Sequence, residues 1–575
     1  MTLTRLQALQ VELEKLDLDG FLIPHADEYQ GEYVPPQSRR LEWLTGFTGS
    51  AGLAIVNQSE SAIFVDGRYI LAVQELVKHF RPYNLKSCHP KQWLLQQPIS
   101  RIGYDPWLHT PNELKPLQHS AATIGSQLIA CEHNPIDKIW QNRPTSPVTP
   151  IISHPLDYSG ETSKSKRQRI GATFGQEFAA ILTASDSIAW LLNTRGNDIP
   201  RVPITLGFAI LYATGIIDWF IIPRSIDDEV LEHLGIEVNI HPLSSFATAL
   251  KKLAHKSILI DPKQTAIWIV NQLEAVAAKV VLESDPCALP KACKNKVEIA
   301  GSRQVHIWDG IAVTRFLHWL DTKTDATHEM QAAQRLEQFR RETGQLCDLS
   351  FDTISATGSN AAIVHYQPTE QTSKQLHSLY LVDSGGQYLQ GTTDVTRTIA
   401  IEPPTAEQKK CFTLVLKGHI NLATCRFPHG TTGSQLDVLA RHALWQAGLD
   451  YDHGTGHGVG SFLSVHEGPH NISVKPNETA LQPGMILSNE PGYYKAGSFG
   501  IRIENLLLVV KAEIGGNQSM LGFETLTLVP IDFKLVEFNL LTEAEITWLQ
   551  NYHARILEQL GPKLEPEVEK WLKTI

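Results

Sequence analysis

The sequence predicts a mixed protein of the α/β (α+β) class, built from three successive domains. Its 575 residues exceed what one hydrophobic core ordinarily organises. The first half repeats one order of elements, a strand, a helix and a β-hairpin, about once per domain length, which indicates duplicated α/β domains. The second half opens with two long helical patterns and continues in strands and glycine-rich turns, which is typical of a larger mixed domain.

The first copy of the repeat begins near residue 19. There, DGFLIPHADEYQ predicts a strand followed by Asp27, a residue type that caps helices. LEWLTGF predicts the helix, and AGLAIVNQSESAIFVDGRY predicts two strands joined by a polar turn. The preceding residues predict an amphipathic helix rather than a signal peptide, because charges separate apolar side chains at helical spacing: Leu6, Leu9, Leu13 and Leu16.

The second copy has the same order. AAILTASDSIAWLLNTRG predicts a strand, a cap at Asp186 and a helix, and GFAILYATGIIDWFIIP predicts two strands about a glycine turn. The Pro- and Ser-rich stretch NRPTSPVTPIISHP predicts a linker between the copies, and a second boundary is expected near ESDPCALPKACKN. We therefore expect one α/β domain at residues 1–150, a duplicate at 151–286 and a third domain at 287–575.

The third domain contains the residues that indicate chemistry. Helical patterns at residues 295–321 and 327–346 open it, and strands with glycine-rich turns follow to about residue 535. Its last part, from TEAEITWLQNYHARILEQL onward, has apolar residues at helical spacing. Such a stripe predicts helices that pack against the domain.

Composition narrows the class of partner. The content of 42% hydrophobic and 19% charged residues is that of a globular protein. A formal net charge of −11 disfavours a nucleic-acid partner and suits cations or peptide amino termini. The seven cysteines contain no CxxC pair, and no segment has the length and apolar character of a membrane span. We expect a cytoplasmic protein with neither a nucleic-acid nor a membrane partner.

The stretch from Tyr451 to Pro469, YDHGTGHGVGSFLSVHEGP, contains three histidines and five glycines. Glycine is kept where a backbone bends sharply or approaches another group closely. Histidine titrates near neutral pH and is a common metal ligand. The stretch containing His453, His457 and His466 therefore predicts a functional site, although the histidines alone do not define its kind.

Four carboxylates in predicted strands define it further. Asp383 and Asp394 lie in LYLVDSGGQYLQGTTDVTRTIAI, which predicts a hairpin, and a buried aspartate is costly unless it is paired or metal-bound. Glu490 ends an apolar run, and Arg502 and Glu504 are two residues apart, on one face of an expected strand.

Two interpretations of these acids remain open. One buried ion pair with Arg502 would explain a single carboxylate. Four carboxylates around a histidine-rich loop fit a site for two metal ions better. Such an oxygen-rich site favours Mn²⁺ and tolerates Co²⁺ or Zn²⁺.

These motifs resemble the pita-bread metallopeptidases, specifically the Xaa-Pro aminopeptidase (aminopeptidase P) family in its long, three-domain cytosolic form. The resemblance is carried by DSGGQYLQGTTDVTRT, HGTGHGVGSFLSVHEGP and EPGYYKAGSFGIRIEN, and it extends to SAGLAIV and VDGRY near the N-terminus. It implies two creatinase-N-like α/β domains followed by a pita-bread catalytic domain, and a homodimer. The five metal ligands that it implies occupy matching positions: Asp383, Asp394, His457, Glu490 and Glu504.

The resemblance also implies roles. Asp383 would bind one ion, Asp394 and Glu504 would bridge two, and Glu490 would additionally accept a proton from the attacking water. Three further histidines would contact the substrate, and two of them would act in catalysis as well: His453 as a binding residue, and His365 and His466 in both roles. Arg502 would hold a ligand carboxylate from the second layer. Tyr493 and Tyr494 are not distinguished by their sequence.

The implied function is the removal of the N-terminal residue from peptides that have a free N-terminus and proline second. A prolidase, which cleaves only Xaa-Pro dipeptides, has the same ligands and is the nearest alternative. A pita-bread protein that binds peptides without cleaving them is a third hypothesis.

Overall fold

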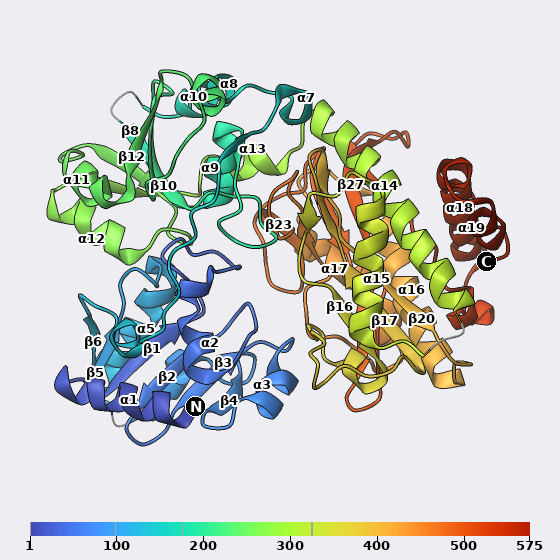
Figure 1. Cartoon of the computed structure of the whole chain (residues 1–575), viewed down its shortest axis with the longest axis horizontal. Helices are drawn as coiled ribbons and strands as arrows, with labels where there is room; N and C mark the ends of the chain where they lie inside the picture. The colour runs from blue at the N-terminus through green and yellow to red at the C-terminus, as the bar shows by residue number, and fades with distance from the viewer. Residues whose placement is uncertain (1, 98, 176–177, 324–325) are drawn as a thin grey trace. The chain divides into compact units, whose positions relative to one another are not determined.

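The computed structural model describes residues 2–97, 99–175, 178–323 and 326–575 (Figure 1). It divides into two compact units. Unit 1 comprises Met1–Pro155 and Glu161–Ala288, and unit 2 comprises Leu156–Gly160 and Leu289–Ile575. The three-domain limits expected from the sequence, at residues 150 and 286, stay a prediction. Among the described helices, none has both the length and the apolar character that crossing a bilayer requires.

Unit 1 contains two six-stranded sheets with the same topology. In the order in which they are hydrogen-bonded, the strands of the first are β4 (Arg81–Asn84), β3 (Ala62–Val65), β2 (Leu53–Asn57), β1 (Gly20–Pro24), β5 (Arg101–Tyr104) and β6 (Gln127–Ala130). Those of the second are β12 (Val238–Pro242), β11 (Ile217–Ile221), β10 (Gly207–Tyr212), β8 (Phe178–Leu182), β13 (Ser257–Ile260) and β14 (Lys279–Leu282). Corresponding neighbours pair in the same sense: each hairpin, and its contact with the strand of that sheet that precedes it in the chain, is antiparallel, and the other pairs are parallel. The repeated strand–helix–hairpin order thus lies in two equivalent sheets.

Both capping predictions were wrong. Asp27 lies well before α2 (Arg40–Thr45), and its Oδ1 instead accepts hydrogen bonds from the backbone N–H groups of Tyr29 and Gly31. The aspartate therefore stabilises a loop, as its side chain readily does. Asp186 lies inside the first turn of α9 (Ser185–Leu192), where a negative charge suits the positive end of the helix dipole.

The N-terminal helix prediction held for three of four leucines. The helix α1 (Thr2–Lys15) buries Leu6, Leu9 and Leu13. Leu16 follows the last helical residue and is 43% exposed. The predicted apolar stripe therefore ends one turn early.

Unit 2 contains the two long helices that the sequence predicted, α14 (Lys296–Thr322) and α15 (Glu329–Glu342), and the structure places them side by side (Figure 1). A first group of short sheets contains β15 (Asp348–Leu349), β18 (Gly386–Tyr388) and β19 (Gly391–Thr392), then β16 (Ile354–Thr357), β17 (Leu379–Ser384) and β20 (Val395–Ala400). The six-stranded sheet follows the order β21 (Phe427–Pro428), β28 (Met520–Thr525), β27 (Asn505–Ala512), β24 (Ile486–Asn489), β22 (Gly456–Gly458) and β23 (Glu467–Ile472). A separate pair is formed by β25 (Gly492–Lys495) and β26 (Phe499–Arg502).

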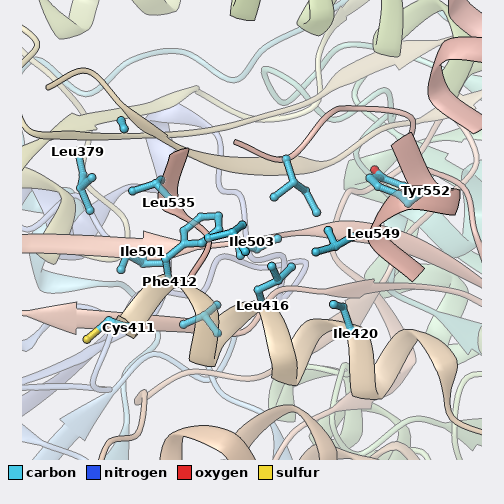
Figure 2. Packing of buried hydrophobic residues seen from close by; sticks show 14 of the residues in the cluster. Leu379, Cys411, Phe412, Leu416, Ile420, Ile501, Ile503, Leu535, Leu549 and Tyr552 are labelled. Atoms are coloured by element: carbon cyan, nitrogen blue, oxygen red, sulfur yellow. The ribbon is translucent and has the colours of Figure 1, made fainter. Parts of the chain in front are cut away.

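A hydrophobic core of unit 2 packs helices against these strands. Figure 2 shows Phe412, Leu416 and Ile420, from α16 (Ala406–Thr424), packed near Ile501 and Leu549. Leu549 belongs to the C-terminal helix α18 (Glu543–Leu560), so the helical tail packs against the unit as predicted. The short helix α19 (Pro566–Leu572) joins the same core through its last residue.

Removing side-chain volume from this core should destabilise unit 2. Leu416 is fully buried, so Leu416→Ala leaves a cavity and is expected to cost about 2–5 kcal/mol. The matched control Leu540→Ala, at a residue 40% exposed, should change stability by no more than about 1 kcal/mol. Denaturant unfolding followed by tryptophan fluorescence measures both, and equal effects would contradict the packing shown in Figure 2.

Candidate metal centre

The five predicted ligands come from neighbouring strands and their ends in unit 2. Asp383 lies in β17, and Asp394 immediately precedes β20, with which β17 pairs in antiparallel register. His457 is the middle residue of β22, Glu490 follows β24, and Glu504 lies between β26 and β27. The two sheets meet where the backbone N–H of Glu504 donates to the Thr396 carbonyl at 3.1 Å.

The strand expected through Arg502 and Glu504 is interrupted in the structure. β26 ends at Arg502, and β27 begins at Asn505. The break places Glu504 at the junction of the two sheets, because its backbone pairs with Thr396 of β20. The prediction of one continuous strand through both residues was therefore wrong.

Three of the ligands converge closely. One ligand atom each from Asp394, His457 and Glu504 can be chosen so that all three lie within 4.8 Å of one another. His457 Nε2 is 3.5 Å from Asp394 Oδ2 and 3.6 Å from Glu490 Oε1. The other ring nitrogen, Nδ1, lies 3.0 Å from the Gly458 carbonyl, which can only accept. Nδ1 therefore donates to that carbonyl, and Nε2 faces the acids.

Asp383 joins the group through Arg502. The buried guanidinium donates from Nη2 to Asp383 Oδ2 at 2.6 Å and from Nη1 to the Tyr494 hydroxyl at 2.8 Å. Its Nε donates to the Thr396 hydroxyl, which in turn donates to Glu504 Oε2 at 2.7 Å. Arg502 thus contacts one predicted ligand directly and a second through Thr396.

Burial and repulsion between the carboxylates make it costly to ionise all the acids of the cluster at once. Burial raises the pKa of Asp383 to about 6, although the Arg502 charge opposes the rise. Burial and the charges of Asp394 and Asp383 raise the pKa of Glu504 well above its ordinary value. Burial alone would lower the pKa of His457, but its hydrogen bond to Asp394 and the charge of Glu490 raise it to about 9. The carboxylates therefore attract positive charge strongly.

The residues present fit divalent cations. Asp383 Oδ1 and Asp394 Oδ1 are buried, and neither has a hydrogen-bond partner among the described residues. Buried carboxylate oxygens without partners are costly unless a cation meets them. Four carboxylates and one imidazole make the hard, oxygen-rich donor set that Mn²⁺ and similar ions prefer.

The glycines of the histidine-rich stretch permit close backbone approach. A Cβ at residue 456 would lie 1.9 Å from the Ser488 carbonyl oxygen, and one at residue 458 would lie 2.3 Å from the Glu467 carbonyl oxygen. Both distances are impossible for any residue with a side chain. Gly456 and Gly458 therefore let β22 carry His457 between its neighbouring strands.

The three substrate-side histidines predicted by resemblance are all half-buried and lie at different points around the cluster. The ring centroid of His466 is 4.2 Å from that of His457. His453 Nε2 is 2.9 Å from the Tyr494 hydroxyl. His365 follows the short helix η3 (Gly358–Ala362), and the carbonyl of the preceding Val364 accepts from Arg502 Nη1 at 3.5 Å. His466 thus lies against a predicted ligand, His453 contacts Tyr494, and His365 follows a residue whose backbone contacts Arg502.

The structure separates the two tyrosines and adds residues that the sequence reasoning missed. Both tyrosines pack against the hydrophobic core, but the Tyr494 hydroxyl also contacts Arg502 and His453. Ser488 accepts from the His457 backbone N–H and donates to Glu490 Oε1 at 3.2 Å. Ser488 and Thr396 each lie two residues from a predicted ligand, so the period of a strand could have identified both.

Four family models match the chain. The description "Creatinase/Prolidase N-terminal domain" applies to two of them, over residues 5–138 and 142–298. "Metallopeptidase family M24" matches residues 300–511, which include all five predicted ligands. "C-terminal region of peptidase_M24" matches residues 519–575.

Relatives match over the whole chain. Aminopeptidase P1 of Lotus japonicus is 36% identical, over 100% of this chain and 98% of the relative. The probable Xaa-Pro aminopeptidase P of Talaromyces stipitatus is 38% identical, over 100% of this chain and 92% of the relative.

A solved structure is also similar to the whole chain. The X-prolyl aminopeptidase of Caenorhabditis elegans, described as a cytosolic enzyme with a di-nuclear active site, is 32% identical. It superposes with a TM-score of 0.95 over 100% of this chain and 98% of the other. The chain therefore belongs to the Xaa-Pro aminopeptidase (aminopeptidase P) family of M24 metallopeptidases.

Proposed function

We propose that the protein is a metal-dependent aminopeptidase that removes the N-terminal residue from peptides with proline in the second position. The observation that carries this proposal is the buried cluster around Asp394, His457 and Glu504, in which two carboxylate oxygens lack partners among the described residues. Similarity to Xaa-Pro aminopeptidases across the whole chain supports the substrate class.

The cluster would hold two divalent ions, and Mn²⁺ is the ion we propose. Asp383 would bind one ion, Asp394 and Glu504 would lie between both, and His457 and Glu490 would complete the set. When bound, two such ions supply a hydroxide nucleophile at neutral pH and polarise the scissile carbonyl. The di-nuclear site of the relative from Caenorhabditis elegans and the oxygen-rich donor set support this assignment.

Glu490 is the proposed base. It follows β24 directly, and the Ser488 hydroxyl donates to its Oε1, while its backbone N–H donates to the Thr455 carbonyl at 2.8 Å. These contacts orient the carboxylate toward His457. A carboxylate held in this way is suited to accept the proton of the attacking water.

Three histidines would handle the substrate. His466, whose ring lies against that of His457, and His365 would donate to the developing oxyanion or pass a proton to the leaving nitrogen. His453, oriented by the Tyr494 hydroxyl, would contact the bound peptide. Arg502 would hold Asp383 in the orientation that the ions require.

A proton donor matters particularly for an Xaa-Pro bond. The proline nitrogen carries no hydrogen, so peptidases that recognise a backbone N–H at that position do not bind the bond well. The nitrogen must still be protonated as it leaves, and a histidine near the cluster can supply that proton.

We further propose that the enzyme acts in the cytoplasm as a homodimer on peptides with a free N-terminus. The relative from Caenorhabditis elegans is described as cytosolic, and that likeness supports the location. The dimer rests on the family resemblance. Sedimentation of the purified protein should give about twice the mass of one chain, and a monomer at micromolar concentration would contradict the proposal.

Asp394→Asn tests the metal centre. An amide supplies no negative charge between two cations, so we expect loss of one or both ions per chain. Since the loss of outer contacts to a ligand already costs about 10–100-fold, activity should fall at least about 100-fold. Metal analysis and tripeptide hydrolysis measure both effects. The control Asp228→Asn, on an exposed residue of α10 (Asp228–Leu234), should change neither; unchanged metal content in Asp394→Asn would refute the bridging role.

Substrate choice distinguishes the alternatives. With Mn²⁺ added, the protein should cleave an Xaa-Pro-Yaa tripeptide and leave the matching Xaa-Ala-Yaa tripeptide largely intact. Chromatography of the products measures both. Hydrolysis of the Xaa-Pro dipeptide alone would indicate a prolidase, and binding without hydrolysis under any added divalent metal would indicate a peptide-binding protein.

A further inference from the structure

A buried ion cluster that the proposed chemistry does not use lies next to His466. It consists of Glu467, Lys291 and Lys294, whose side chains are 0%, 3% and 1% exposed. Lys291 Nζ is 2.9 Å from Glu467 Oε2, and Lys294 Nζ donates to Glu467 Oε1. Burying three charges is costly, and it persists only where the groups hold one another in a defined geometry. The cluster therefore fixes the position of the Glu467 side chain.

The two lysines come from the segment through which the chain enters unit 2. Lys291 lies in α13 (Ala288–Ala292), and Lys294 directly precedes the residue that caps α14. The Lys294 backbone N–H donates to the Gly484 carbonyl at 3.0 Å, and its Nζ also donates to the Lys291 carbonyl at 3.1 Å. Ala292, between the two lysines, is fully buried in a second hydrophobic cluster of unit 2, which includes Leu481 and Met485. The segment is thus anchored independently of Glu467.

The three residues of this cluster lie in regions matched by two different family models. Both lysines lie within residues 142–298, which match a creatinase/prolidase N-terminal domain model. Glu467 lies within residues 300–511, which match the M24 model. The ion cluster therefore joins the end of one matched region to the interior of the other.

Glu467 is also packed against the strand of a predicted ligand. It begins β23 directly after His466, and its backbone lies opposite Gly458 of β22, next to His457. A Cβ at residue 460 would lie 3.2 Å from Glu467 Oε2, so the glycine-rich stretch closes over the carboxylate. The adjacent His466 ring lies against the His457 ring.

We infer that Glu467, clamped by Lys291 and Lys294, is a positioning residue that holds His466 beside the metal centre. Fixing the Glu467 side chain fixes the backbone at which the His466 side chain originates. Displacing a catalytic group by about 1 Å can cost about 100-fold in rate. The inference rests on the proposed function, since it takes His466 as a group that acts on the substrate. It adds that the segment entering unit 2 sets the position of this group.

The experiment compares full-length, Mn²⁺-loaded variants on an Xaa-Pro-Yaa tripeptide. Glu467→Gln removes the charge that pairs both lysines, and Glu467→Asp keeps that charge on a shorter side chain. Glu478→Gln makes the same chemical change as Glu467→Gln on an exposed acid a few residues away and is the matched control. Metal content and circular dichroism give the folded, loaded fraction, to which kcat is normalised.

We expect Glu467→Gln to lower the normalised kcat about 10–100-fold, with KM changed less than about 3-fold and two ions still bound. Glu467→Asp should recover at least half of that loss on a logarithmic scale, and Glu478→Gln should match the wild-type protein. A purely structural role would lower the folded fraction and leave the normalised kcat at the wild-type value, and that result would overturn the inference.

A second variant tests the inference in case Glu467→Gln does not fold. If Glu467→Gln fails to fold because two buried ammonium groups lose their shared carboxylate, Lys294→Met combined with Glu467→Gln removes one of them. A folded double variant with reduced normalised kcat supports positioning, and one with wild-type kcat overturns it. A wild-type protein that does not cleave the tripeptide counts against the proposed function, whereas equal cleavage by wild type and Glu467→Gln counts against the positioning role alone.

Discussion

Repulsion among four carboxylates inside unit 2 is the constraint on which the rest of the site depends. The sheets bring Asp394 and Glu504 together around His457, and Arg502 pairs with Asp383. One guanidinium does not balance four acids, and burial together with the neighbouring carboxylates raises the pKa values of Asp383 and Glu504. A chain that buries such a group gains most when divalent cations occupy it, because metal binding then contributes to the stability of the folded state.

The surrounding framework holds the acids in place despite their repulsion. Thr396 and Ser488 donate to ligand carboxylates from strand positions, and the buried Arg397 donates to the Glu504 carbonyl. Glycines at 456 and 458 let the backbone of β22 approach its neighbours. These contacts all come from groups of the protein itself, and they orient the carboxylates within the cluster.

Much of the site could be predicted from the sequence, because acids within apolar strand patterns are unusual enough to be informative. The pattern singled out Asp383, Asp394, Glu490 and Glu504, and the resemblance added His457 to make five predicted ligands. The predictions for Asp27 and for the strand through Arg502 failed because of hydrogen bonds that residue type alone does not fix. Asp27 turned out to bind loop N–H groups instead of capping a helix, and the strand at Arg502 stops because Glu504 pairs with another sheet. Tyr494 and Tyr493 are adjacent and chemically identical, so only the fold distinguishes them.

Anomalous scattering from a crystal soaked in Mn²⁺ tests the central claim most directly. The account predicts two peaks about 3.5–4 Å apart, both within coordination distance of Asp394 and Glu504, with His457 Nε2 bound to one of them. Peaks elsewhere on the chain, or no manganese between these side chains at saturating concentration, would contradict it.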